Sequence, residues 1–207
     1  DEVSFAMNRV SMLYKDTEWR PTYYLFSSTN VRPSKPWAKQ WQESVRQSIG
    51  EENTTSFVAS MFKPFVDPFD EFQKTLWFDT LSENKPTLEG LIKPSCFSTN
   101  VVERIDKTGT TMNLALQLCY FMGFSEIVFV GADLGWTKDT GTNADPNHFD
   151  KNYVAEILRP EKANHQMRNV HSLSLEYFQN RTEHEVKFYN ASARTVLDVY
   201  PIIDYKK

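Results

Sequence analysis

At 207 residues the chain is long enough for one domain, and a net charge of −4 argues against a nucleic-acid-binding protein, because such proteins are usually basic. No apolar run approaches the ~18 residues that span a bilayer, and no signal-peptide pattern is present, so the sequence predicts a cytoplasmic protein. Cys96 and Cys119 lack metal-motif spacing and are interpreted as reduced, buried thiols. The chain begins at Asp1 rather than Met, which we interpret as a fragment or a trimmed chain.

Two short apolar runs near the start predict buried strands, at Val3–Met7 and Thr22–Phe26. Small polar side chains follow each run: Asn8 after the first, and Ser27 and Ser28 after the second. The carboxyl ends of parallel strands line ligand sites in open α/β sheets, so these side chains are candidates for one site. The alternative is that Asn and Ser simply begin turns.

The next hundred residues are less regular. Trp37 and Trp41 in the segment Arg32–Arg46 have the i, i+4 spacing of one helix face, which is typical of a packing stripe. Thr55–Met61 predicts a third strand. Lys63–Asn100 is interrupted by prolines and crowded with aromatic residues, and we interpret it as short helices and loops over the strand edge, forming a lid or an acceptor sub-lobe.

The most readable stretch lies in the middle of the chain. Thr110 and Thr111 can cap the start of a helix, and Gly123 suits the position just after its end because glycine tolerates positive φ. Ile127–Val130 is apolar without alternation, which predicts a parallel strand covered on both faces. Asp133 follows the end of this strand and is the third polar strand end.

The last third of the chain predicts a long loop, a helix at Lys162–Arg181 and a strand at Val186–Tyr189, followed by a short helix from Asn190 to near Val199. The aspartates of the loop do not have EF-hand spacing, so no metal site is expected. Alternation of strands and helices predicts an α/β fold with one mainly parallel sheet and helices on both faces, in a single domain spanning residues 1–207 with 63–100 as a sub-lobe.

Several segments together resemble a known enzyme family. They read SFAMNR, YYLFSS, GTTM followed by MGFSEIVFVGADLGW, HFDKNY, and VKFYNASARTVLDVYPIID. This pattern resembles bacterial sialyltransferases of glycosyltransferase family forty-two, and it is similar to the wider group of Maf-type flagellin glycosyltransferases and MptE-like proteins. The resemblance covers most of the chain, but only weakly in residues 31–100. It implies a Rossmann-like, GT-A-like sheet that binds a CMP-activated sugar.

The resemblance also implies roles for individual residues. The matched nucleotide-binding and donor-binding positions are Asn8, Ser27, Ser28, Thr110, Thr111 and Asp133. Tyr153 and Trp136 stand nearest to the tyrosines that meet the leaving phosphate, although Trp has no hydroxyl, and Arg104 is the nearest candidate for binding the donor carboxylate. The Gly-rich first strand of the family has no counterpart here: either it lies upstream of the chain, or nucleotide binding is compromised.

Transfer of a sugar from a CMP donor needs a general base for the acceptor hydroxyl, and histidine has a suitable pKa. The available histidines are His148, His165 and His171, with His184 near a surface turn. By family spacing His165 is the expected base and His148 a ligand-positioning residue. A DxD pattern is absent, so the expected reaction needs no metal and no cofactor other than the CMP-sugar substrate.

Three functions follow from these patterns. The first is a glycosyltransferase that moves a sialic acid-like or other nonulosonic acid from a CMP donor to a glycan or protein hydroxyl. The second is an MptE-like pterin diphosphokinase using ATP and Mg²⁺, and the third is a non-catalytic domain of a surface-polysaccharide protein. The expected partners are the donor and the acceptor, with no nucleic acid. Peripheral membrane association and oligomerisation are left open.

Overall fold

The computed structural model describes residues 2–81, 97–103, 105–106, 110–134, 149–150, 152–153, 162–181, 183–193 and 195–204. Its contacts cluster into two compact units. Unit 1 comprises Asp1–Thr80 with Asn152–Ala155, and unit 2 comprises Leu81–Lys151 with Glu156–Lys207. The expectation of one domain over 1–207 with a sub-lobe at 63–100 stays a prediction.

Unit 1 is built on a four-stranded parallel sheet in the order β1-β2-β3-β4. The strands are β1 (Phe5–Met7), β2 (Tyr23–Phe26), β3 (Thr55–Ala59) and β4 (Thr75–Phe78). The α/β fold with a parallel sheet is therefore confirmed. β4 lies in the proline-rich segment for which the sequence predicted only helices and loops.

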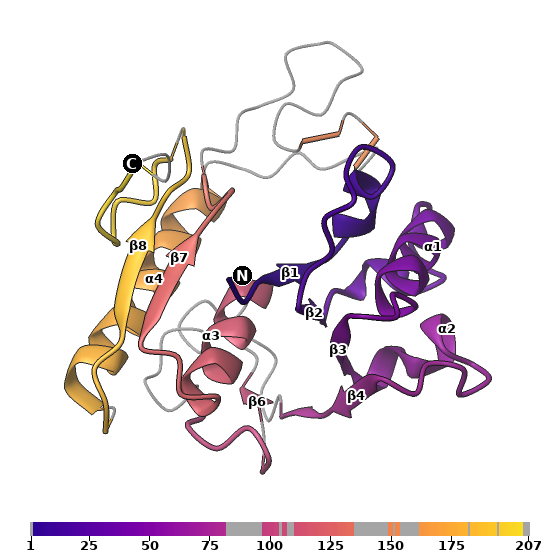
Figure 1. Ribbon diagram of the computed structural model, residues 1–207, viewed down its shortest axis with the longest axis horizontal. Helices are drawn as coiled ribbons and strands as arrows, with labels where there is room; N and C mark the ends of the chain where they lie inside the picture. Colours follow the sequence, from indigo (N-terminus) through magenta and orange to yellow (C-terminus); the bar gives the residue numbers. More distant parts are fainter. Residues whose placement is uncertain are drawn as a thin grey trace. The chain divides into compact units, whose positions relative to one another are not determined.

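Helices complete the crossovers of this sheet, as parallel strands require. Between β2 and β3 runs α1 (Ala38–Ile49), and α2 (Lys63–Val66) follows β3 on the same side of the sheet (Figure 1). Trp41 is buried on α1 and its ring lies 6.2 Å from that of Phe26 on β2, which confirms the packing role. Three short 3-10 helices are η1 (Val10–Leu13), η2 (Thr29–Val31) and η3 (Ser60–Phe62).

Unit 2 contains two long helices and two paired strands. Its main elements are α3 (Thr111–Phe121), β7 (Glu126–Phe129), α4 (Lys162–Arg181) and β8 (Lys187–Asn190). β7 and β8 are parallel neighbours, with Ile127 opposite Phe188. Figure 1 shows the two strands side by side with α4 against them. The remaining short strands are β6 (Ile105–Asp106), in unit 2, and β5 (Thr80–Leu81), where the chain passes from unit 1 to unit 2.

The end of α3 has the geometry that the sequence predicted for Gly123. Gly123 has φ +81°, its N–H donates to the Tyr120 carbonyl, and the Phe124 N–H donates to the Cys119 carbonyl. These two bonds form a Schellman motif, which satisfies carbonyls that the helix would otherwise leave unpaired. The tight corner turns the chain directly from α3 into β7.

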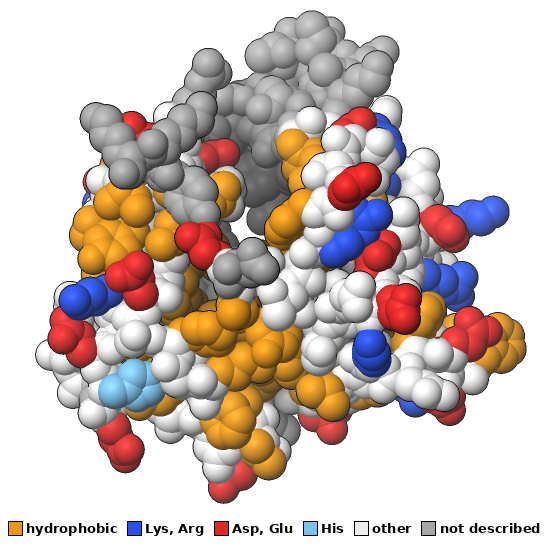
Figure 2. All heavy atoms as spheres, in the orientation of Figure 1, with side chains coloured by type: hydrophobic (Ala, Val, Ile, Leu, Met, Phe, Trp, Pro, Cys, Tyr) orange, Lys and Arg blue, Asp and Glu red, His pale blue; other side chains and the backbone are white. Residues whose placement is uncertain are grey.

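An aromatic core holds unit 2 together. Its buried members are Phe97, Leu116, Tyr120, Phe129, Ala132, Phe178, Phe188, Leu197 and Tyr200. Burial raises the pKa of the nearby Cys119 thiol to about 12, so this cysteine is buried and reduced as expected. On the face drawn in Figure 2, hydrophobic side chains gather over α3, where Phe121 and Met122 are exposed at its end.

Two details of the sequence prediction were wrong. We expected β1, β2, β7 and β8 in one sheet, but β7 and β8 form a separate parallel pair in unit 2. Ile127 and Val128 are accordingly only half-buried, because β7 pairs with β8 alone among the described strands. The described residues after β8 also form no helix, because side-chain oxygens of Asn190 and Thr195 take the backbone N–H groups of Ser192 and Leu197.

His171 lies in the core rather than in a site. It is 1% exposed on α4, and its Nδ1 is 2.9 Å from the hydroxyl oxygen of Tyr200. Its ring also contacts Phe129 edge-on. Burial lowers the pKa of His171 to about 4, because the charged imidazolium is poorly solvated there. This histidine is a neutral structural residue and not a candidate base.

We predict that His171 makes the protein acid-sensitive. The folded pKa lies below the ordinary 6.5, so the unfolded chain binds more protons between pH 6.5 and 4. The stabilisation is therefore full above pH 6.5 and is lost as the pH falls toward 4. Between pH 7 and pH 5, the wild type should lose about 2 kcal/mol more unfolding free energy than His171→Gln, measured by urea titration. Equal losses in the two proteins would contradict this assignment.

Candidate functional site

The carboxyl edge of the parallel sheet in unit 1 carries the first group of predicted site residues. Asn8 follows β1, and Ser27 and Ser28 follow β2, so all three lie where parallel strands end. Ser27 is buried. The Ser28 hydroxyl accepts from the Asn30 N–H and so caps η2. That these three side chains belong to one ligand site stays a prediction.

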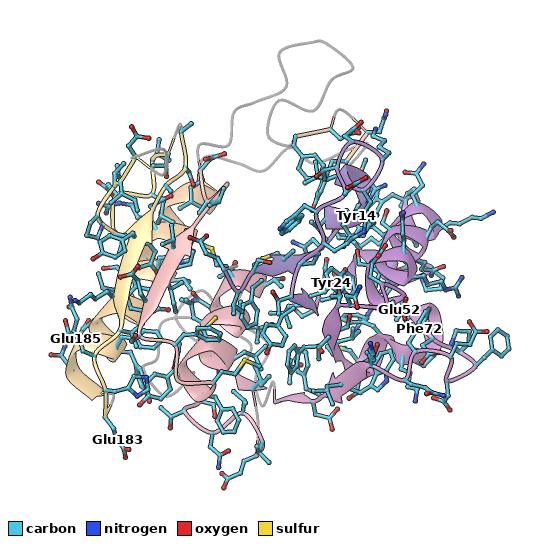
Figure 3. All side chains as sticks on the ribbon, viewed as in Figure 1. Tyr14, Tyr24, Glu52, Phe72, Glu183 and Glu185 are labelled. Carbon is cyan, nitrogen blue, oxygen red and sulfur yellow. The ribbon has the colours of Figure 1, made fainter. Side chains whose placement is uncertain are left out.

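Asn8 has an unusual conformation. Its φ of 58° is left-handed, a region that residues other than glycine rarely adopt. The Tyr24 hydroxyl donates to its carbonyl at 2.6 Å and so holds the turn in place (Tyr24 is labelled on β2 in Figure 3). The Asn8 Oδ1 atom is buried with no hydrogen-bond partner in the described part of the chain. A buried acceptor left unsatisfied requires an explanation, and a bound ligand or water is one.

Arg9 continues this edge as a buried cation. Its Nε donates to the Ser44 hydroxyl at 3.0 Å, and Nη1 donates to the carbonyls of Asn152 and Tyr153. The guanidinium also lies 5.8 Å from the Trp41 ring centroid and 5.7 Å from that of Tyr153. The hydroxyl of Tyr153 accepts from the Arg9 backbone N–H at 3.4 Å. Arg9 therefore fixes Asn152 and Tyr153 of the HFDKNY segment within unit 1.

In unit 2, the loop after β7 carries the second strained turn. Gly131 has φ +72° and Leu134 has φ +59°. A leucine in the left-handed region is a genuine outlier, because its Cβ meets the backbone there. Asp133 stands between these two residues with its side chain exposed. Partial desolvation raises the pKa of the Asp133 carboxyl above its usual range.

A buried amide holds this loop against the segment after β8. The Nδ2 group of Asn190 donates to the Ala132 carbonyl, the Thr195 hydroxyl and the Leu197 carbonyl, at 3.1 to 3.2 Å. The Ser192 hydroxyl accepts from the Ala132 N–H at 2.8 Å, so both backbone groups of Ala132 are used. These hydrogen bonds thus hold the loop in the strained conformation in which the Asp133 side chain is exposed.

From the chain order we infer that two helices of unit 2 begin at the edge where Asp133 follows β7. α3 leads into β7 and α4 leads into β8 through short connections, so both helices run antiparallel to the strands and begin at the strands' carboxyl edge. Thr110 caps α3, its hydroxyl accepting from the Met112 N–H at 3.3 Å, as predicted. Thr111 is the first residue of α3, and His165 lies in the first turn of α4.

The structure thus gathers the predicted residues into two sets. Asn8, Ser27, Ser28 and Tyr153 belong to unit 1, whereas Thr110, Thr111, Asp133 and His165 belong to unit 2. One cleft shared by both sets stays a prediction. Arg104, Trp136 and His148 lie outside the described residues. Within the described residues, no cluster of three or more His, Cys, Asp or Glu side chains is suited to hold a metal ion.

Three buried polar residues were missed by the sequence analysis. They are Arg9, Asn113 and Asn190, all at most 6% exposed. Asn190 was read only as the start of a helix. Polar residues next to apolar runs carry a weak signal, because the same pattern is usual at any turn. Their importance depends on partners distant in sequence, such as Tyr153 for Arg9 and Ala132 for Asn190.

No protein-family model, curated protein or solved structure matches this chain significantly. The resemblance to family forty-two therefore stays a prediction. In the part of the chain that the structure describes, no helix is both long enough and apolar enough to cross a membrane.

We expect Asn190→Ala to release the Asp133 loop. The substitution leaves the Leu197 carbonyl and the Ser192 N–H without their buried partner, and unmet groups of this kind cost ~1–3 kcal/mol each. The unfolding free energy should fall by about 3 kcal/mol in urea titration. Hydrogen exchange should accelerate at the Val196 N–H, which donates to the Asp133 carbonyl.

Asn180→Ala is the matched control for this experiment. Asn180 is exposed on α4, and alanine is the better helix former, so stability should be unchanged or slightly higher. Slow exchange at Val196 in Asn190→Ala would show that the loop does not depend on the buried amide.

Proposed function

We propose that this protein is a glycosyltransferase that moves a sugar from a CMP-activated donor, with a nonulosonic acid such as sialic acid as the expected sugar, to a hydroxyl of a glycan or protein. The observation that carries the proposal is the carboxyl edge of unit 2. The hydrogen-bonded Asp133 loop follows β7 at this edge, and the chain order and strand direction would bring the capped start of α3 and the first turn of α4, with His165, to the same edge. Ligands of α/β folds bind at such edges.

The start of α3 supplies the anion site that the donor requires. The N-terminus of a helix carries partial positive charge and unpaired N–H groups, which favour a phosphate. Thr110 and Thr111 add hydroxyls at this point, and both are half-buried and therefore accessible. As the bond to the sugar breaks, negative charge grows on the departing CMP phosphate, and these donors would stabilise it.

The acceptor side of the reaction needs a base and an orienting group. His165 would take the proton from the acceptor hydroxyl as its oxygen bonds to the anomeric carbon and CMP departs. Asp133 carries a carboxylate, which a phosphate would repel, so hydroxyl groups of the ribose or the sugars are its natural partners.

Thr111→Val is expected to weaken nucleotide binding without unfolding the protein. Valine keeps the shape of threonine but removes the hydroxyl, so the affinity for CMP should fall by roughly 10-fold, while the melting temperature changes little. Calorimetric titration with CMP, CDP, ATP and GTP measures both the loss and the base preference. Thr17→Val, in the exposed connection between β1 and β2, is the control and should bind CMP like the wild type.

This titration also decides between the functional classes. Binding of CMP in preference to ATP and GTP supports the proposal. Binding that requires ATP with Mg²⁺ would replace it with phosphotransfer, and a wild type that binds none of these nucleotides would indicate a non-catalytic domain.

His165→Ala is expected to lower kcat by roughly 10²–10⁴-fold, the usual effect of removing a general base, with nearly unchanged CMP affinity. The measurement is CMP release from a CMP-sugar in the presence of an acceptor. His184→Ala is the matched control, because it removes a different histidine, one that is exposed and whose ring stacks on Tyr120. It should keep the turnover of the wild type. Normal turnover in His165→Ala and none in His148→Ala would assign the base to His148 instead.

A further inference from the structure

Asn113 is a fully buried amide without a hydrogen-bond partner among the described residues. It lies in the first turn of α3, three residues after the cap Thr110, and has 0% exposure. Neither Oδ1 nor Nδ2 has a hydrogen-bond partner in the described part of the chain. Gln117, one turn later on the same face, provides a contrast: its Oε1 accepts from the Ser98 N–H at 3.0 Å, and its Nε2 donates to the Asn113 carbonyl at 3.1 Å.

The unmet amide is costly for the folded protein. A buried donor or acceptor without a partner costs ~1–3 kcal/mol, and Asn113 carries both. Asparagine is also a weaker helix former than leucine, which would suit a buried position on α3 better. An unsatisfied buried group of this kind requires an explanation such as a missing ligand or water.

The amide is directed toward the start of the helix. Each Cα–Cβ bond of an α-helix tilts toward the N-terminus, so the side chain of Asn113 leans back toward the turn that Thr110 caps. Thr110 and Thr111 are half-buried, so this turn reaches solvent while Asn113 lies beneath it. Asn113 therefore lies in the turn at which the proposed phosphate would bind, covered from solvent in the ligand-free structure.

The chemistry of the amide narrows the class of ligand. A phosphate offers only acceptors, so it would satisfy Nδ2 and repel Oδ1. A ligand that satisfies both atoms must present a donor and an acceptor side by side. The edge of a nucleobase does so in one plane, which is how asparagine reads adenine in nucleic acids. Cytosine presents its 4-amino group as donor beside N3 as acceptor.

We propose that Asn113 reads the cytosine base of the donor, with Oδ1 accepting from the 4-amino group and Nδ2 donating to N3. This inference rests on the proposed function, because it adds the base contact to the same site whose phosphate lies at Thr110 and Thr111. It makes Asn113 a specificity-determining residue, although Asn113 takes no part in the bond-making step.

The test combines one substitution with one change in the ligand. Affinities of the full chain are measured by calorimetry for CMP and for its 2-pyrimidinone analogue, which lacks the 4-amino group. The wild type should bind CMP roughly 10-fold more tightly than the analogue, in line with ~1–3 kcal/mol for a bidentate base contact. Asn113→Leu should bind both ligands equally, and CMP about 10–100-fold more weakly than the wild type does.

Two further readouts separate base reading from other roles. Ribose 5-phosphate, which has no base, should bind the wild type and Asn113→Leu alike. The free Asn113→Leu protein should keep or raise its melting temperature, because the substitution removes two unmet polar groups. If leucine does not fit and the variant unfolds, Asn113→Ala takes its place. The comparison of the wild-type affinities for CMP and for the 2-pyrimidinone analogue needs no variant.

Several outcomes would overturn the inference. Equal wild-type affinities for CMP and the analogue would exclude the base contact. Undiminished CMP binding by Asn113→Leu would show that the amide holds a buried water only. Weaker binding of ribose 5-phosphate by the variant would assign the effect to the phosphate site instead. A wild type that does not bind CMP would overturn the proposed function and this inference together, whereas the first three outcomes leave the proposed function intact.

Discussion

The buried amide of Asn190 is the interaction on which the candidate site of unit 2 depends. One Nδ2 group reaches three oxygens, from Ala132, Thr195 and Leu197, and so ties the end of β7 to the segment after β8. Both connections leave the same parallel strand pair, so the link joins them at the carboxyl edge. Without it, nothing in the local sequence would favour the left-handed turn at Leu134 that presents Asp133.

The aromatic core explains why such a rigid edge can form on only two paired strands. A two-stranded sheet is marginal by itself, so β7 and β8 depend on the helices that pack against them. Phe178 on α4 and Phe188 on β8 have ring centroids 4.8 Å apart, and Phe129 on β7 lies 4.7 Å from Tyr200. Burial of these rings stabilises the strand pair, and the hydrogen-bonded edge is built on that support.

The sequence predicted the elements of the fold better than their assembly. Strands such as Tyr23–Phe26 and the helix Lys162–Arg181 were found because apolar runs and helical spacing are local signals. The cap at Thr110 and the turn at Gly123 were found for the same reason. The separate pairing of β7 with β8 was missed, since strand pairing depends on contacts distant in sequence. In the candidate site, too, only local signals could be recognised. Asp133 was predicted from its position after a strand, whereas Arg9 and Asn190 act through partners that no local pattern reveals.

The two units share one feature that a purely structural role does not explain. In each, the first turn after a parallel strand contains a residue other than glycine with positive φ: Asn8 at 58° after β1, and Leu134 at 59° after β7. Glycine would adopt either conformation at lower cost, since it has no Cβ. At the first turn the side chain provides an amide acceptor without a partner among the described residues, and at the second the neighbouring Asp133 is exposed. Strain that places unsatisfied polar groups at the carboxyl edge of a sheet is the arrangement expected where a polar ligand completes the structure.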